Sequence, residues 1–119
     1  MNACLIGLNI TNYILAILLS KKGFQVDIIC EEKNKYVKNN RTIGISKKNI
    51  EFLKSILKIP NQYLWPTYQI EIFNLKNNSS QKLKFKDSKN ENFFLITSNN
   101  LLNIFEKKCK ELKNIYIKK

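Results

Sequence analysis

The sequence predicts an α/β fold with an antiparallel excursion, and three observations predict it. An apolar run, a helical segment and a second apolar run follow one another within the first 30 residues. Two later segments alternate apolar and polar side chains on either side of a polar turn, and a further helical segment precedes a last apolar run. A chain of 119 residues, 44% of them hydrophobic, can bury a core without disulfides or metals, so we expect one domain over residues 1–119.

Residues 3–8 form a short apolar run typical of a strand that is buried on both faces, and the run ends at Gly7. A helix follows, with Thr11 or Asn12 as its cap and Gly23 placed to end it. Its expected apolar positions at helical spacing are Ile14, Leu15, Leu18 and Leu19.

Residues 24–30 are again an apolar run, interrupted by Asp27. Strand, helix and strand within about 30 residues predict a βαβ unit, whose strands are parallel and whose crossover is right-handed.

Further along, Ser46 can cap a helix that runs to about Lys58. The side chains on its expected buried face are Ile50, Leu53, Ile56 and Leu57. Residues 67–75 and 81–86 alternate around the polar stretch 77–80, which indicates a β-hairpin.

Residues 93–96 form one more short strand in this interpretation, and a helix capped by Ser98 or Asn99 comes after it. Its expected buried stripe contains Leu101, Leu102, Phe105, Cys109 and Leu112. Glu106 and Lys110 are spaced to pair at i,i+4, and residues 114–117 form the last strand.

The composition excludes several functional classes. The sequence has no His, which removes the usual general base at neutral pH and the commonest metal ligand. The formal net charge is +12, but every basic residue except Arg41 is a Lys. Nucleic-acid readers favour Arg and interleave aromatic side chains, so we interpret the charge as a solvated surface and expect no nucleic-acid partner.

Three cysteines without a C-x-x-C pair favour neither a disulfide framework nor a zinc site, and they suggest a reducing, cytoplasmic location. The apolar stretch 3–19 is interrupted by Asn9, Thr11 and Asn12, so we expect no transmembrane segment.

A βαβ unit at the start of a chain is a candidate dinucleotide site, because the helix N-terminus offers backbone N–H groups to a pyrophosphate. The full fingerprint is G-x-G-x-x-G, and here its three positions read Gly7, Asn9 and Asn12. The acidic residue expected at the end of the second strand is replaced by Cys30, with Glu31 directly after it. Taken alone, this pattern is equally typical of a purely structural βαβ unit.

Four separated segments add to this pattern. They are residues 4–7 (C-L-I-G), 41–46 (R-T-I-G-I-S), 64–66 (L-W-P) and the helix and strand of 96–117. Read in order, they resemble the FAD-dependent aromatic hydroxylases, and the R-T-I-G-I-S segment is similar to the R-T-x-A-L-S segment of the ubiquinone-biosynthesis branch. The resemblance implies a Rossmann-like βαβ unit of an FAD-binding domain with a β-hairpin excursion.

By this resemblance, the turn at Gly7, Asn9 and Asn12 would hold the FAD pyrophosphate, and Glu31 would stand in for the ribose-binding acid. Arg41 matches an Arg that contacts the flavin cofactor. The family has a basic or amide side chain near the start of the later helix, where this chain has Asn100 and Asn103.

Members of the family are several times longer, so the resemblance implies an incomplete domain: a truncated chain, or one whose remainder comes from a second chain or a ubiquinone-biosynthesis complex. The implied function is the FAD-binding part of a monooxygenase that hydroxylates an aromatic ring, with room for peripheral membrane contact. Two alternatives stay open: a non-catalytic relic or interaction module without FAD affinity and, more remotely, a basic nucleic-acid-binding domain.

Overall fold

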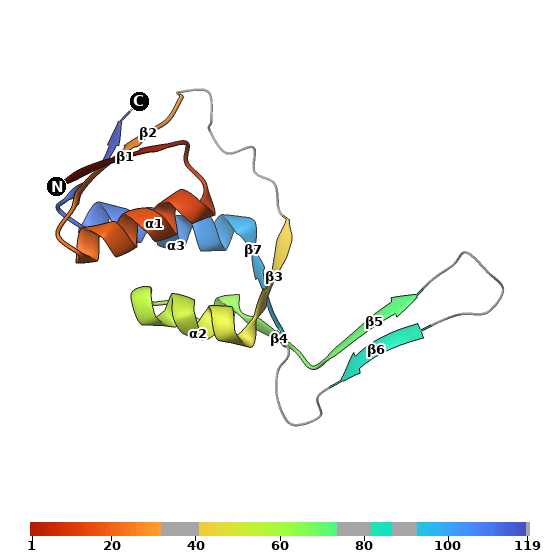
Figure 1. Ribbon diagram of the computed structural model, residues 1–119. Coiled ribbons are helices and arrows are strands. Elements are labelled where there is room, and N and C mark those ends of the chain that lie inside the picture. The colour runs from red at the N-terminus through yellow and green to blue at the C-terminus, as the bar shows by residue number, and fades with distance from the viewer. Residues whose placement is uncertain (32–40, 74–81, 87–92, 119) are drawn as a thin grey trace.

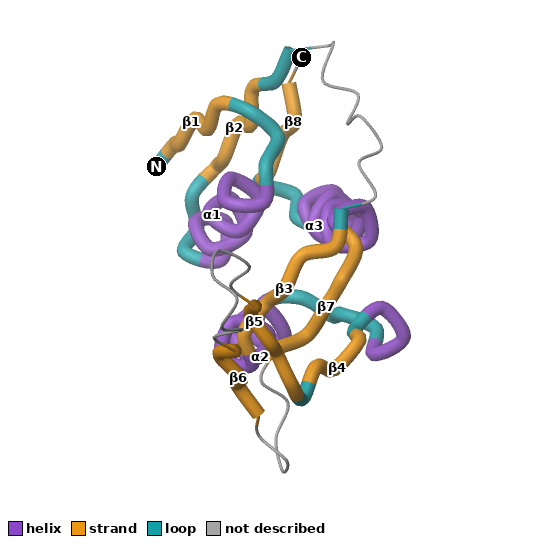
Figure 2. Tube along the Cα trace, turned by 90° about the vertical axis from the view of Figure 1, so that its right-hand side faces the viewer, coloured by secondary structure: helices purple, strands orange, loops and turns teal. Residues whose placement is uncertain are grey.

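The computed structural model describes residues 1–31, 41–73, 82–86 and 93–118. Helices α1 and α3 form a middle layer between a parallel sheet and a second layer, which contains an antiparallel sheet and helix α2 (Figures 1 and 2). This arrangement is the α/β fold expected from the sequence. Along the chain, the antiparallel strands come after the second strand of the parallel sheet and before its third. The bounds of the helices are α1 (Ile10–Lys21), α2 (Lys47–Ile56), η1 (Asn61–Tyr63, a 3-10 turn) and α3 (Ser98–Glu111).

The parallel sheet has the order β1-β2-β8 in the described part of the chain. Its strands are β1 (Asn2–Ile6), β2 (Gln25–Ile29) and β8 (Ile115–Lys118). Both neighbouring pairs are parallel, as the βαβ pattern predicts, with Ala3 opposite Val26 and Val26 opposite Ile115.

The prediction that β1 and β2 are buried on both faces is wrong. Val26 and Ile28 are fully buried beneath the helices, whereas Ile6 is 82% exposed and Ile29 is 43% exposed. Both crossover helices pack on the same face, so among the described residues nothing covers the other one. We call this surface the open face; its side chains are Asn2, Cys4, Ile6, Gln25, Asp27, Ile29, Tyr116 and Lys118.

Helix α1 begins earlier and buries a different stripe than expected. Asn9, in extended conformation, is its N-cap, and Gly23 follows its end with φ +85. Nearly every residue in the middle of this helix is apolar, so periodicity could not select the buried face. The buried residues are Tyr13, Ala16, Ile17 and Ser20, while Leu15 is 40% exposed.

The antiparallel sheet has the order β3-β7-β4. Its strands are β3 (Thr42–Ser46), β7 (Phe93–Thr97) and β4 (Trp65–Thr67). Only β7 was expected as a strand. Helix α2 follows β3 directly, capped by Ser46 as predicted, and it buries Ile50, Leu53 and Ile56.

Strands β5 (Gln69–Phe73) and β6 (Lys82–Lys86) confirm the hairpin, with Ile70 opposite Phe85 and Ile72 opposite Leu83. The connecting stretch 77–80 lies outside the described residues. The hairpin projects from the body of the molecule (Figure 1).

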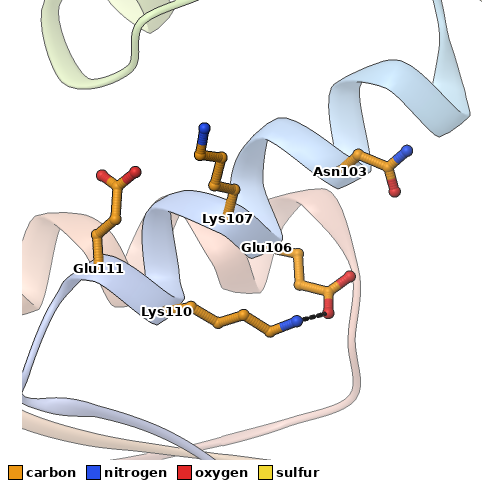
Figure 3. Close-up of a pocket in the computed structure, with 5 residues that line it drawn as sticks. All are labelled: Asn103, Glu106, Lys107, Lys110 and Glu111. Atoms are coloured by element: carbon orange, nitrogen blue, oxygen red, sulfur yellow. Dashed lines mark hydrogen bonds and ion pairs between the residues drawn. The ribbon is translucent and has the colours of Figure 1, made fainter.

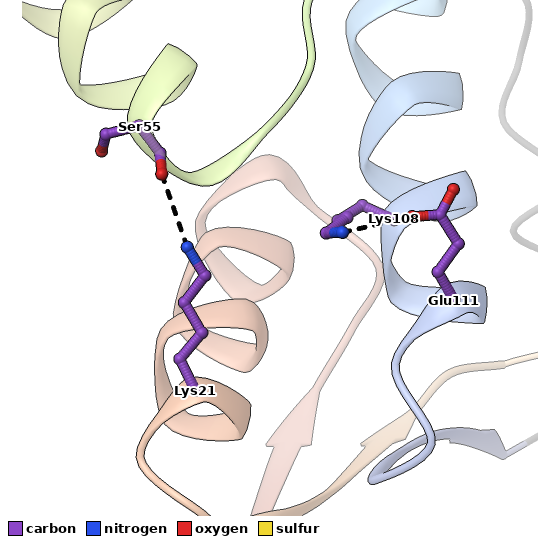
Figure 4. A network of polar contacts seen from close by, with 4 residues as sticks. All are labelled: Lys21, Ser55, Lys108 and Glu111. Atoms are coloured by element: carbon purple, nitrogen blue, oxygen red, sulfur yellow. Dashed lines mark hydrogen bonds and ion pairs between the residues drawn. The ribbon is translucent and has the colours of Figure 1, made fainter.

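Helix α3 is capped by Thr97, not by Ser98 or Asn99, and its fully buried residues are Leu101, Phe105 and Cys109. The Glu106–Lys110 pair is present at 2.6 Å. Tyr13 of α1 stacks on Phe105 with the ring centroids 6.1 Å apart, which joins the two helices in the core. Lys21 Nζ donates to the backbone oxygen of Ser55 at 3.5 Å and so connects α1 to α2 (Figure 4).

In the described ranges no helix is both long and apolar enough to span a membrane. The three cysteines are free thiols, with Cys4 exposed and Cys30 and Cys109 buried.

Candidate functional site

The turn between β1 and α1 is built around three residues of the degenerate fingerprint. Gly7 has φ +94, a conformation that L side chains rarely adopt, and its N–H donates to the oxygen of Ile29 at 2.7 Å. This bond places the turn beside the end of β2. The side-chain oxygen of Asn9 accepts the backbone N–H of Asn12 at 2.9 Å, as an N-cap does.

The side chain of Asn12 forms hydrogen bonds with the backbone of the turn. Its Nδ2 donates to the backbone oxygen of Ile6 at 2.7 Å and to that of Gly7 at 2.8 Å. In the full fingerprint this position is a third glycine, which lets the helix pack closely on the strand. Instead the side chain fills the turn with hydrogen bonds, and Tyr13 and Ile17 behind it remain fully buried.

Two backbone donors are left at the start of α1. The N–H groups of Ile10 and Thr11 have no hydrogen-bond partner in the described structure. The first helical bond begins only at the N–H of Tyr13, and the side-chain oxygen of the N-cap Asn9 accepts the N–H of Asn12. No acidic side chain lies in the first turn. The turn therefore offers an anion two N–H groups and the positive end of the helix dipole.

The end of β2 lies next to this turn. Cys30 is 9% exposed, its N–H donates to the oxygen of Lys118 at 3.0 Å, and it occupies the place where a ribose-binding acid is expected. Glu31 follows it and is exposed. A carboxylate is thus present one residue beyond the strand position, while Glu32 lies outside the described residues.

Arg41 directly precedes β3 and is exposed. Its backbone oxygen accepts the N–H of Ser98 at 2.8 Å, which fixes it against the first turn of α3. Helices α1 and α3 run side by side in the same direction and begin at the same end of the molecule (Figure 1). Arg41 therefore stands at the end where both helices present their N-termini, with no side-chain partner among the described residues.

The structure thus brings Gly7, Asn9, Asn12 and Glu31 to one edge of the parallel sheet and sets Arg41 at the same end of the helix layer. This edge is formed by the carboxyl ends of parallel strands, where α/β proteins bind their ligands. The free N–H groups of Ile10 and Thr11 lie in the backbone stretch 9–12, which the family resemblance assigns to the pyrophosphate. Asn100 and Asn103 lie apart from this turn and line a groove described below.

In the described residues, no group of three or more His, Cys, Asp and Glu side chains could hold a metal ion. The polar groups at the sheet edge are backbone N–H donors and one carboxylate acceptor, which suit a phosphate-bearing organic ligand better than a metal.

No family model matches this sequence, and no curated protein matches it either. Solved structures do share its fold. PqsL from Pseudomonas aeruginosa, a probable FAD-dependent monooxygenase, aligns over 99% of this chain with a TM-score of 0.73 and 14% identity. The p-nitrophenol 4-monooxygenase PnpA from Pseudomonas putida DLL-E4 aligns over 98% with a TM-score of 0.74 and 15% identity.

CtdE, solved in complex with FAD and a substrate, aligns over 98% of this chain with a TM-score of 0.68 and 19% identity. The chain spans about a third of the length of these proteins: 32% of PqsL, 31% of PnpA and 30% of CtdE. Its fold is therefore that of a partial Rossmann-like unit, shared with part of the chain in flavin-dependent monooxygenases.

Proposed function

We propose that this chain is the N-terminal FAD-binding portion of a flavin-dependent monooxygenase. The observation that supports this most is the turn after β1, which keeps two unpaired N–H groups and a positive-φ glycine at the carboxyl edge of a parallel sheet. The fold around this turn is the one shared with the FAD-dependent monooxygenases over nearly the whole chain.

In this proposal the N–H groups of Ile10 and Thr11 bind the pyrophosphate, and Gly7 keeps side-chain atoms out of its path. Glu31 accepts hydrogen bonds from the adenosine ribose, because the buried thiol of Cys30 is a weak acceptor. Arg41 holds the flavin side of the cofactor through a planar guanidinium that Lys could not replace. FAD, when bound, supplies the redox chemistry with oxygen.

The finer proposal is hydroxylation of an aromatic ring in ubiquinone biosynthesis. It is supported by the resemblance of residues 41–46 to the segment of that branch, which the structure lays out as strand β3 followed by the Ser46 cap. The titles of the structural neighbours name other compounds, such as p-nitrophenol for PnpA.

We also propose that a further polypeptide segment, in the same or another chain, covers the open face. Parallel sheets are covered on both faces, and here Ile6, Ile29 and Tyr116 are 82%, 43% and 46% exposed. Between them, Asp27 Oδ1 is buried without a hydrogen-bond partner in the described structure, while its other oxygen pairs with Lys118. A covering segment would supply the missing donor and the rest of the active site.

The reactivity of the Cys4 thiol shows whether a segment covers the open face, because Cys4 is exposed and lies opposite Asp27 on that face. We expect maleimide to modify Cys4 quickly in the purified chain and much more slowly when the chain is made together with the product of the adjoining coding sequence. Equal rates in both preparations would contradict the cover.

A second candidate function is a non-catalytic module that has kept the framework, and the same turn carries the observation that favours it. Asn9 Oδ1 already accepts a hydrogen bond from the N–H of Asn12, and the side chain of Asn12 fills the turn by donating to the oxygen of Gly7. Both contacts compete with a phosphate for the space and the donors of the turn.

Titration of the purified chain with FAD, followed by flavin fluorescence and calorimetry, separates the two functions. We expect weak binding that ADP competes away and that Gly7→Ala combined with Arg41→Ala abolishes. Lys48→Ala is the matched control, since Lys48 is an exposed lysine outside the turn. No binding at high micromolar FAD, in a chain shown to be folded, would leave the non-catalytic module as the function of the isolated chain.

A further inference from the structure

A groove beside α3 is lined by none of the residues that we propose to bind FAD. It lies between α3, the end of α2 and the turn η1, and its volume is about 640 Å³. Small-molecule sites in proteins commonly have volumes of about 300–1,000 Å³, so the groove has room for one small ligand. Gly7, Asn9, Glu31 and Arg41 do not line it.

Part of the lining of the groove is apolar. Three of its lining residues are apolar: Leu57 directly after α2, which is 5% exposed, the half-buried Ile104 of α3, and Pro60 directly before η1. These side chains can cover a hydrocarbon or aromatic body but offer it no hydrogen bonds.

The rim carries uncompensated positive charge. Lys58 and Lys107 both line the groove, and neither has an ion-pair or hydrogen-bond partner in the described structure. Lys108 also lines it but is paired with Glu111 at 3.2 Å (Figure 4). Figure 3 shows Lys107 and Glu111 on one side of α3, away from the Glu106–Lys110 pair. The groove thus holds two unpaired cations and one neutralised pair.

Neutral polar groups complete the lining. The side chains of Asn100 and Asn103 and the hydroxyl of Tyr63 reach the groove without hydrogen-bond partners among the described residues. Amides and a phenol can donate to an anionic oxygen, and the amides can also accept from a ligand hydroxyl.

From this lining we infer that the groove binds a small organic anion, whose apolar body packs on Leu57, Pro60 and Ile104 and whose carboxylate or phosphate contacts Lys58 and Lys107. The apolar lining residues select against inorganic ions, and the two free cations select against neutral compounds. The site is independent of FAD, since it shares no lining residue with the turn after β1.

The test uses the full chain, labelled with ¹⁵N, and phenyl phosphate as the probe. We expect saturable shifts of the side-chain amides of Asn100 and Asn103 and of the backbone amide of Lys107, unchanged when FAD is added. Phenylacetate in place of phenyl phosphate determines whether the head group is a carboxylate or a phosphate. Inorganic phosphate and benzyl alcohol, which each lack one half of the ligand, should bind at least about tenfold more weakly.

Lys58→Gln and Lys107→Gln should each weaken phenyl phosphate binding about threefold to tenfold, because each removes one partly solvated charge contact. Lys48→Gln is the matched control: it removes the same charge from an exposed, unpaired lysine outside the groove. All three side chains are on the surface, and the dispersion of the amide spectrum verifies that each variant is folded.

The inference is overturned if phenyl phosphate and phenylacetate produce no saturable shifts, or if inorganic phosphate binds as tightly as they do. It is also overturned if Lys48→Gln weakens binding as much as Lys107→Gln, because the effect would then be that of net charge alone.

Discussion

Ser20 Oγ donates a hydrogen bond of 2.6 Å to Asn114 Oδ1, although the two residues are 94 positions apart in the chain. The same Asn114 uses its Nδ2 to donate to the backbone oxygens of Ser20 at 3.1 Å and Phe24 at 2.7 Å. Asn114 directly precedes β8, so its side chain links the start of that strand to the end of α1 and to the residue before β2.

Asn114→Ala should destabilise the fold by about 2–3 kcal/mol, because three partly buried groups lose their partner at once. Urea unfolding measures the change in the free energy of unfolding. Asn49→Ala is the control, since that side chain is exposed on α2 and should change stability by less than about 0.5 kcal/mol. Equal losses in the two variants would contradict a role for Asn114 in joining the strands.

Asn9→Gly should strengthen FAD binding about tenfold. The substitution removes the side-chain oxygen that occupies the N–H of Asn12 and so gives the pyrophosphate a third donor, while glycine as an N-cap costs only a few tenths of a kcal/mol. Asn9→Asp is the matched variant: it caps the helix equally well but places a negative charge at the turn, so FAD affinity should fall. If the two variants bind FAD alike, the pyrophosphate does not lie at this turn.

Cys30→Glu should strengthen the binding of FAD and ADP by roughly tenfold to a hundredfold, because a carboxylate at the strand end accepts hydrogen bonds from the ribose hydroxyls. Glu31→Ala in the native background should weaken both ligands. Calorimetric titration with ADP isolates the adenosine half. If Cys30→Glu folds but leaves the affinity for ADP unchanged while Glu31→Ala removes binding, then Glu31 alone binds the ribose. If neither substitution changes the affinity, the ribose does not bind at the end of β2.

Stability should fall between about pH 9 and 11 through one buried thiol. Desolvation by burial, and secondarily the charge of Glu106, raise the pKa of Cys109 from 9.0 to about 11. The unfolded chain then releases this proton at lower pH than the folded one, so the stabilisation is complete below pH 9 and is lost as the pH rises toward 11. We expect a loss of about 1–2 kcal/mol across this window.

Cys109→Ala separates this effect from the titration of the lysines. Its stability should fall less steeply between pH 9 and 11 than that of the native chain, even though its stability at pH 7 is lower through the lost packing. Parallel slopes in thermal unfolding would contradict the assignment.

Much of the fold could be predicted because its signals are local. The βαβ unit, the Ser46 cap and the hairpin each depend on a pattern within a few residues. Strands β3 and β4 could not be predicted in this way: their partner in both cases is β7, far along the chain, and β4 contains Pro66 within three residues. Only the long-range pairing makes them strands.

The turn after β1 could be predicted in position but not in its hydrogen bonds, and its role in binding FAD stays a prediction. The fingerprint located the turn at Gly7 and the sheet edge near Glu31. It could not show that Asn12 would donate to the oxygens of Ile6 and Gly7, because those bonds depend on the path of the turn in space. The open face was missed for a related reason: the burial of a strand depends on what lies above it, and local sequence does not contain that information.

The outer edge of β1 has a consequence for the behaviour of the chain in solution. That edge pairs with no strand in the described structure, so its backbone groups and the apolar Ile6 form a template on which a second copy could add. The net charge of +12 keeps such copies apart by repulsion. Since salt screens this repulsion beyond a distance of about 10 Å at 0.1 M, we expect association of the chain through this edge to increase with ionic strength.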